Sequence, residues 1–177
     1  VLATALSMLW AWLGAAPIER ATALALHVAF AAYGFMGLLA LGLAYILVPM
    51  FALASNPADR PALASCALAV AALPLAAAAA LGIAPTALRV TAIALGACAV
   101  GLHLRAMLAA LGSGMRRELG RSFVLVRFGW AMLVASLALA AALALGAPVP
   151  GLAPLFGLAL IGGWLLSFLL GMLQRIL

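Results

Sequence analysis

The chain has 177 residues, of which 70% are hydrophobic and 7% are charged, and its formal net charge is +6. A water-soluble domain carries about 25% charged residues, so this composition excludes a soluble globule and predicts an integral membrane protein whose first partner is the lipid bilayer. The basic residues are all arginines, which stand at predicted helix ends or in one loop and act there as orientation signals; we therefore expect no nucleic-acid partner.

Breaks at proline, glycine and charged residues divide the chain into six predicted transmembrane helices. They cover residues 1–16, 20–48, 61–83, 86–112, 122–146 and 152–177. A helix needs about 20 apolar residues to cross a bilayer, and short connections make consecutive helices antiparallel neighbours. The sequence thus predicts an all-α polytopic membrane bundle that forms one transmembrane domain over residues 1–177.

The arginines predict how this bundle is oriented. One side of the membrane receives Arg60, Arg116, Arg117 and Arg121, with Arg105, Arg127 and Arg175 close to it, and the other side receives Arg20 and Arg89. Because cytoplasmic loops are enriched in basic residues, the first side is expected to be cytoplasmic. We expect a multi-pass protein of the bacterial inner (cytoplasmic) membrane with both ends of this chain in the cytoplasm.

Two histidines lie inside these apolar segments at different depths. His27 is seven residues below the outer end of the 20–48 helix, about 10 Å in, whereas His103 is about 25 Å into the 86–112 helix. The two imidazoles are therefore not expected to be the two axial ligands of one haem. His103 neighbours Arg105, so we expect it at the inner interface or in a structural role.

An internal repeat links two of the predicted helices. When residues 34–48, GFMGLLALGLAYILV, are set beneath 163–177, GWLLSFLLGMLQRIL, Gly34 falls on Gly163 and Gly42 on Gly171. The offset is four helices, which is typical of a duplicated helical unit. Small residues allow helix backbones to approach closely in lipid, and the same spacing leaves room for a flat macrocycle above Gly34, on the face it shares with His27.

The segment HVAFAAYGFMGLLALGLAYILVP resembles the second transmembrane helix of haem-copper oxidase and nitric-oxide reductase catalytic subunits, and GGWLLSFLLGMLQRIL is similar to a later helix of small relatives of that subunit. The resemblance implies a b-type haem near the outer side of the membrane, with His27 as an axial ligand of its iron. His27, Gly34 and Tyr33 are the cofactor-binding residues we expect from this pattern. It also implies about twelve helices, of which this chain would be the first half, with the second axial ligand in the part beyond it.

The chain departs from that family where the oxidase chemistry takes place. The residue that the repeat sets opposite His27 is Phe156, and the helix 152–177 contains no histidine, glutamate or tyrosine. Copper sites need imidazole ligands, so we expect no copper and no oxygen reduction by this chain. The expected function is therefore electron transfer, sensing or haem handling, with a redox partner or further helices of the same subunit.

Two other functions remain open at this stage. Repeats with glycine- and proline-broken helices also occur in secondary transporters and channels, although such proteins normally carry a charged group at mid-membrane. A non-catalytic membrane scaffold subunit needs no polar site at all, and His27 would then be a structural histidine that forms hydrogen bonds between helices. The chain begins without methionine and stops inside an apolar segment, so we expect it to be a fragment of a longer protein.

Overall fold

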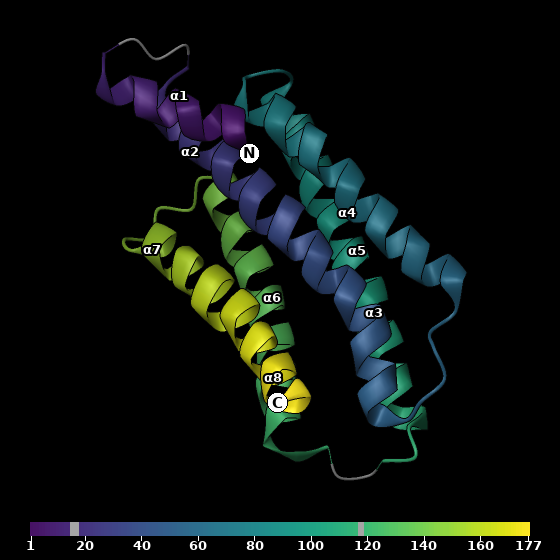
Figure 1. Ribbon diagram of the computed structural model, residues 1–177. Helices are drawn as coiled ribbons and strands as arrows, with labels where there is room; N and C mark the ends of the chain where they lie inside the picture. The colour runs from purple at the N-terminus through teal and green to yellow at the C-terminus, as the bar shows by residue number, and fades with distance from the viewer. Residues whose placement is uncertain (15–17, 117–118) are drawn as a thin grey trace.

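The computed structural model describes residues 1–14, 18–116 and 119–177, and every regular element within them is a helix. The elements are α1 (Leu2–Trp12), α2 (Arg20–Val28), η1 (Ala29–Gly37), α3 (Leu38–Ala52), α4 (Asp59–Ala80), α5 (Pro85–Ser113), α6 (Gly120–Ala144), α7 (Leu152–Gly157), η2 (Leu158–Leu166) and α8 (Ser167–Ile176). The two η segments are π-helical, and each continues directly into the α-helices on either side of it (Figure 1).

Five helices are long and apolar enough to cross a membrane, so this is a multi-pass membrane protein of the all-α class, as predicted. They are Arg20–Ala52, Asp59–Ala80, Pro85–Ser113, Gly120–Ala144 and Leu152–Ile176. The sequence had suggested a sixth span over residues 1–16. In its place α1 has 11 residues, about 16 Å of helix, roughly half the hydrocarbon thickness; residues 15 and 16 lie outside the described residues.

A tight turn joins α4 and α5 and sets them side by side. Two residues after α4 ends at Ala80 comes Gly82, whose φ of +86° belongs to the left-handed region that favours glycine. The Ile83 amide then donates to the Ala78 carbonyl (3.0 Å). The next helix begins at Pro85, a position where the missing amide hydrogen costs nothing. The two helices therefore pack as an antiparallel pair along the right of Figure 1.

The core lies where α6 meets the helix Leu152–Ile176. At Gly129 of α6, a side chain would lie 3.3 Å from the backbone nitrogen of Phe168 and from the carbonyl oxygen of Trp164. Such a close approach of backbones is what small residues permit in lipid. Around this contact, Trp130, Trp164 and Phe168 join a cluster of buried apolar side chains that also takes in residues of α3 and α5.

The two π-helical segments occupy equivalent places in the repeat predicted from the glycines. Leu158, which begins η2, lies 129 positions after Ala29, which begins η1, and the same offset joins Gly34 to Gly163. The segments end in the same register and touch one another in the middle of the bundle. The repeat therefore extends from the residue pattern to the local backbone conformation.

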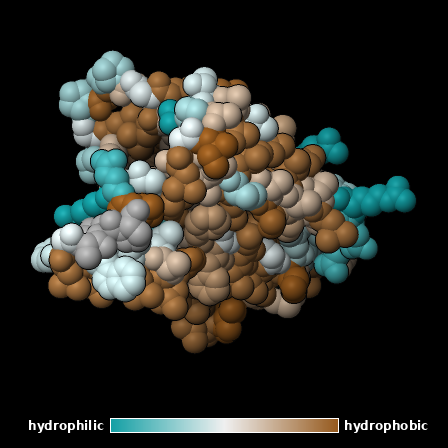
Figure 2. Space-filling view, turned by 90° about the horizontal axis from the view of Figure 1, so that it is seen from above, coloured by the Kyte–Doolittle hydropathy of each residue, from teal (hydrophilic) through white to brown (hydrophobic). Residues whose placement is uncertain are grey.

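The surface of the bundle is apolar. Seen from the end that carries α1, hydrophobic side chains cover most of the visible face, and hydrophilic ones project at its edge (Figure 2). Large exposed apolar side chains occur on every long helix, among them Phe35, Ile46, Leu63, Val90, Val124, Leu158 and Ile161. Patches of this extent belong to a protein whose solvent is lipid.

Candidate functional site

His27 lies on α2 at the contact with α1, where a threonine determines which of its ring nitrogens carries the proton. The Thr4 hydroxyl donates its hydrogen to the Val1 carbonyl (2.7 Å), and its oxygen lies 3.2 Å from His27 Nδ1. Since a hydroxyl has one hydrogen, Thr4 Oγ1 must accept from the Nδ1–H of His27. In a neutral imidazole this arrangement leaves the lone pair on Nε2, the nitrogen that could then bind a ligand.

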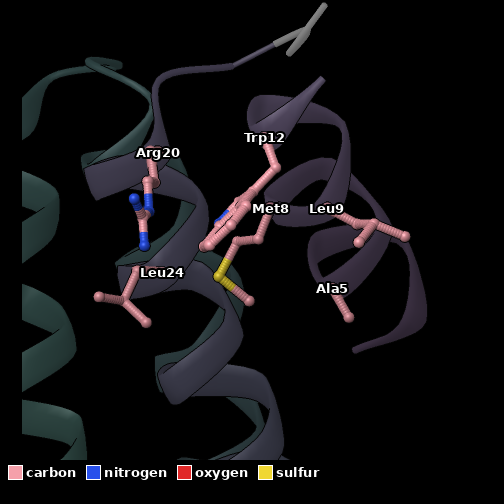
Figure 3. Close-up of a pocket in the computed structure, with 6 residues that line it drawn as sticks. All are labelled: Ala5, Met8, Leu9, Trp12, Arg20 and Leu24. Atoms are coloured by element: carbon pink, nitrogen blue, oxygen red, sulfur yellow. The ribbon is translucent and has the colours of Figure 1, made fainter. Parts of the chain in front are cut away.

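An open groove between α1 and α2 adjoins this hydrogen bond. It has a volume of about 540 Å³ and is lined by Ala5, Met8, Leu9 and Trp12 of α1 and by Arg20 and Leu24 of α2 (Figure 3). Ala5 follows Thr4 in the chain, and Leu24 precedes His27 by one helical turn. Thr4 and His27 are thus close in the chain to residues that line the groove, although neither lines it.

The other end of the groove carries a positive charge. The Arg20 guanidinium lies 5.9 Å from the centre of the Trp12 ring, within the range of a cation–π contact. Figure 3 shows the indole between the two helices with Arg20 beside it and the Met8 sulfur nearby. The pairing of α1 and α2 thus places a cation in the lining of a mainly apolar groove, and His27 lies one helical turn beyond Leu24 on α2.

The structure places Gly34 and Tyr33 away from this groove. A Cβ added at Gly34 would lie 3.2 Å from a Leu73 methyl group, so α4 fills the space above this glycine. The Tyr33 hydroxyl donates to Ser136 Oγ (3.1 Å) of α6, and its ring lies 5.9 Å from that of Trp164. His27, Gly34 and Tyr33 therefore contact three different neighbours and are not brought together.

The backbone conformation between His27 and Gly34 explains why they do not face the same neighbour. Seven residues return to the same face of an α-helix, but a π-helical turn closes its hydrogen bonds one residue later. Since η1 begins at Ala29, the shared face expected for His27 and Gly34 is lost. The space for a macrocycle was predicted above Gly34; the structure instead offers open space between α1 and α2.

Sequence reasoning missed the contribution of α1. Thr4 and Ser7, three residues apart, put two hydroxyls on neighbouring turns of an apolar helix. Ser7 is 6% exposed, and its Oγ finds no hydrogen-bond partner among the described residues. The spacing of these hydroxyls was a signal that α1 faces something polar.

His103 differs from its expected position. It is 1% exposed and lies inside the core, with its ring 5.1 Å from that of Tyr45 and 6.4 Å from that of Trp130. The prediction that it reaches the inner interface is therefore wrong, and the structural alternative stands. Its neighbour Arg105 is exposed on another face of α5.

In the described part of the chain, no three His, Cys, Asp or Glu side chains gather as they would around a bare metal ion. Comparison of the chain with protein-family models, with curated proteins and with solved structures gives no match.

Proposed function

We propose that this chain is a membrane haem-binding protein in which His27 is an axial ligand of a b-type haem. The observation that carries the proposal is the Thr4 hydroxyl, which donates to the Val1 carbonyl and accepts from His27 Nδ1. Histidines that ligate metals almost always donate their other ring N–H to an oxygen, which fixes the ring and the tautomer.

The residues of the groove fit the remaining parts of a haem. Met8, Trp12 and Leu24 offer apolar walls to the macrocycle, and Arg20 offers a guanidinium to a propionate, which it can bind with two parallel hydrogen bonds. The unpartnered Ser7 hydroxyl is a further donor at the same helix contact. The haem would supply one-electron chemistry, and this chain would bind and orient it.

The proposed setting is the inner membrane of a bacterium, with both ends of the chain in the cytoplasm and the groove near the outer side. The distribution of arginines supports this orientation. The role is electron transfer, sensing or haem handling, with a redox partner or further helices of the same protein supplying what this chain lacks. We propose neither a copper site nor oxygen reduction.

An oxidised-minus-reduced visible spectrum of the full-length protein, purified from haem-replete cells, tests the proposal. We expect sharp b-type bands in the wild type and none in His27→Ala. Thr4→Val should retain the bands with a weakened haem affinity or a shifted midpoint potential, because the ring loses its acceptor.

Arginine variants provide a matched pair for this experiment. Arg20→Gln should weaken haem retention, whereas Arg89→Gln should not, since Arg89 belongs to the same side of the membrane but donates to the Ala144 carbonyl (2.6 Å). A wild-type protein without b-type bands, or bands that persist in His27→Ala, would refute the haem assignment.

A further inference from the structure

A second groove lies between α5 and the loop that joins α3 to α4, at the opposite end of the bundle from α1 (Figure 1). It has a volume of about 330 Å³, and we call it the Arg105 groove. One wall consists of residues 55–58 and Pro61. The other wall is a single face of α5, whose residues recur at the three- and four-residue spacing of a helix: Leu102, Arg105, Ala106, Ala109, Ala110 and Ser113.

Backbone contacts hold the two walls of this groove together. The amides of Met115 and Arg116 donate to the carbonyls of Leu53 and Ala52, both at 3.3 Å. At Gly114 an added Cβ would lie 2.5 Å from the Ala52 carbonyl oxygen, so the chain after α5 passes the end of α3 more closely than a side chain would allow. The α3–α4 loop therefore starts from a point that is tied to the end of α5, which is typical of a pre-formed site.

The α4–α5 pair places Arg105 at a surface of the hydrocarbon. Asp59, which begins α4, is 21 residues before the end of that helix at Ala80, and Arg105 is 20 residues after the start of α5 at Pro85. Each is thus about 30 Å along its helix from the turn between them, which is the thickness of the hydrocarbon. Irregular backbone cannot face lipid, so this turn lies at one surface of the hydrocarbon. Arg105 then lies at the other surface, at the depth of the phospholipid phosphates.

The polar part of the groove suits an anion. Arg105 is exposed within it, and a guanidinium can bind a phosphate with two parallel hydrogen bonds. The Ser55 hydroxyl and the Asn56 amide are further donors on the opposite wall. No aspartate or glutamate is among the described residues that line the groove. Asp59 and Arg60 are exposed and stand outside that lining.

The apolar part of the groove distinguishes a lipid from a free phosphate ion. Leu102 continues the lined face of α5 toward the centre of the bilayer, about one helical turn from Arg105. The short side chains of Ala106 and Ala109 leave the helix surface open to an elongated ligand, opposite the ring of Pro61. A ligand with a phosphate and an acyl chain contacts both parts of the groove, whereas inorganic phosphate contacts only the polar part.

We propose that the Arg105 groove binds an anionic phospholipid, whose phosphate is held by the Arg105 guanidinium and whose acyl chain follows α5 past Leu102. Basic pockets between transmembrane helices bind lipid headgroups in this way. The site is independent of the haem proposal, because the α1–α2 groove lies at the other end of the helix Arg20–Ala52.

Native mass spectrometry of the full-length protein in detergent tests the proposal, with phosphatidylglycerol or phosphatidylcholine added in equal amounts. We expect the wild type to retain phosphatidylglycerol in preference to phosphatidylcholine. Arg105→Gln should weaken the binding of phosphatidylglycerol about fivefold or more, because one basic side chain is lost from the headgroup. Arg60→Gln is the matched control: it removes the same charge at the same depth but outside the groove, and binding should stay within about twofold of the wild type.

A second variant tests the shape of the groove without changing its charge. Ala109→Leu places a larger side chain on an exposed position of the lined face, where leucine is compatible with a helix, and should also weaken the binding of phosphatidylglycerol. Equal retention of the two lipids, or equal losses in Arg105→Gln and Arg60→Gln, would overturn the proposal. So would unchanged binding in Ala109→Leu, or displacement of the lipid by millimolar inorganic phosphate, because the ligand would then need no acyl chain.

Discussion

The two helices that carry the repeat have the same backbone conformation but pack against different neighbours. Arg20–Ala52 and Leu152–Ile176 each change from α to π conformation at the same offset, and each carries glycines in matching positions. The second lies along α6 through most of its length, whereas the first divides its contacts among α1, α4, α5 and the second copy. A duplicated sequence thus keeps its local geometry, while packing decides what each copy can do.

His27 and its counterpart Phe156 show this difference most directly. Phe156 lies between the two copies, with its ring 6.3 Å from that of Tyr33, in an apolar contact that has no use for a lone pair. His27 lies at the contact of α1 with α2, where Thr4 can orient it, and the groove between these two helices begins one helical turn away at Leu24. A polar histidine is thus accommodated in the first copy, Arg20–Ala52, which is less completely packed at this position.

The largest expected effect comes from exchanging these two residues. Under the proposed function, His27→Phe should lose the b-type bands completely. Phe156→His should leave them unchanged, and the double exchange should not restore them, because position 156 has neither the threonine nor the groove. The visible spectrum of each purified variant is the measurement. b-type bands in the doubly exchanged variant would show that positions 27 and 156 are equivalent, which would contradict the difference described between the two copies.

The matched glycines Gly171 and Gly42 should respond in opposite directions to alanine. A Cβ at Gly171 would lie 2.8 Å from the Ser122 carbonyl oxygen and from a Val126 methyl group, whereas Gly42 has no atom of the described residues within 4 Å of that position. Gly171→Ala should therefore lower the free energy of unfolding by about 1–3 kcal/mol. Gly42→Ala should raise it by about 0.5–1 kcal/mol, because glycine is the poorer helix former. Reversible unfolding in mixed micelles measures both.

The pair Gly163 and Gly34 should show the same order with a smaller difference. A Cβ at Gly163 would lie 2.7 Å from Met132 Cγ and 2.9 Å from its Cβ, while at Gly34 the nearest atom is the end of the Leu73 side chain at 3.2 Å. Leu73 can move by a few tenths of an ångström, but the Met132 Cβ is tied to the α6 backbone. We expect Gly163→Ala to destabilise by about 1–2 kcal/mol and Gly34→Ala by less, measured as above. Equal effects would mean that Gly163 packs no more tightly against α6 than Gly34 packs against α4.

The smallest effect concerns a hydrogen bond from the first copy to α6. Tyr33 Oη donates to Ser136 Oγ, which in turn donates to the Leu133 carbonyl (2.8 Å). Tyr33→Phe should cost about 1 kcal/mol, the net value of a typical hydrogen bond, and should leave the b-type bands in place because Tyr33 lies outside the groove. A loss of those bands in Tyr33→Phe would instead show that Tyr33 contributes to the cofactor site.

The membrane class, the helical state and most helix limits could be predicted from the residues. The predicted segment 86–112 became Pro85–Ser113 and 152–177 became Leu152–Ile176, since a proline or a glycine stands at such ends and the effect is local. The segment 1–16 was misassigned because its hydropathy resembles that of a span, while its hydroxyls carried the more useful signal. The repeat, too, is local enough to be visible in the glycines.

Composition and the spacing of glycine, proline and arginine determined that this chain is a membrane protein of long helices, two of which are copies. Each of these properties depends on residues that are close together in the chain. The surroundings of individual side chains depended on the tertiary structure alone. Thr4 meets His27 across 23 positions, and Tyr45 meets Trp130 through His103. Those meetings follow from which helices pack together, and the local pattern of residues does not determine that.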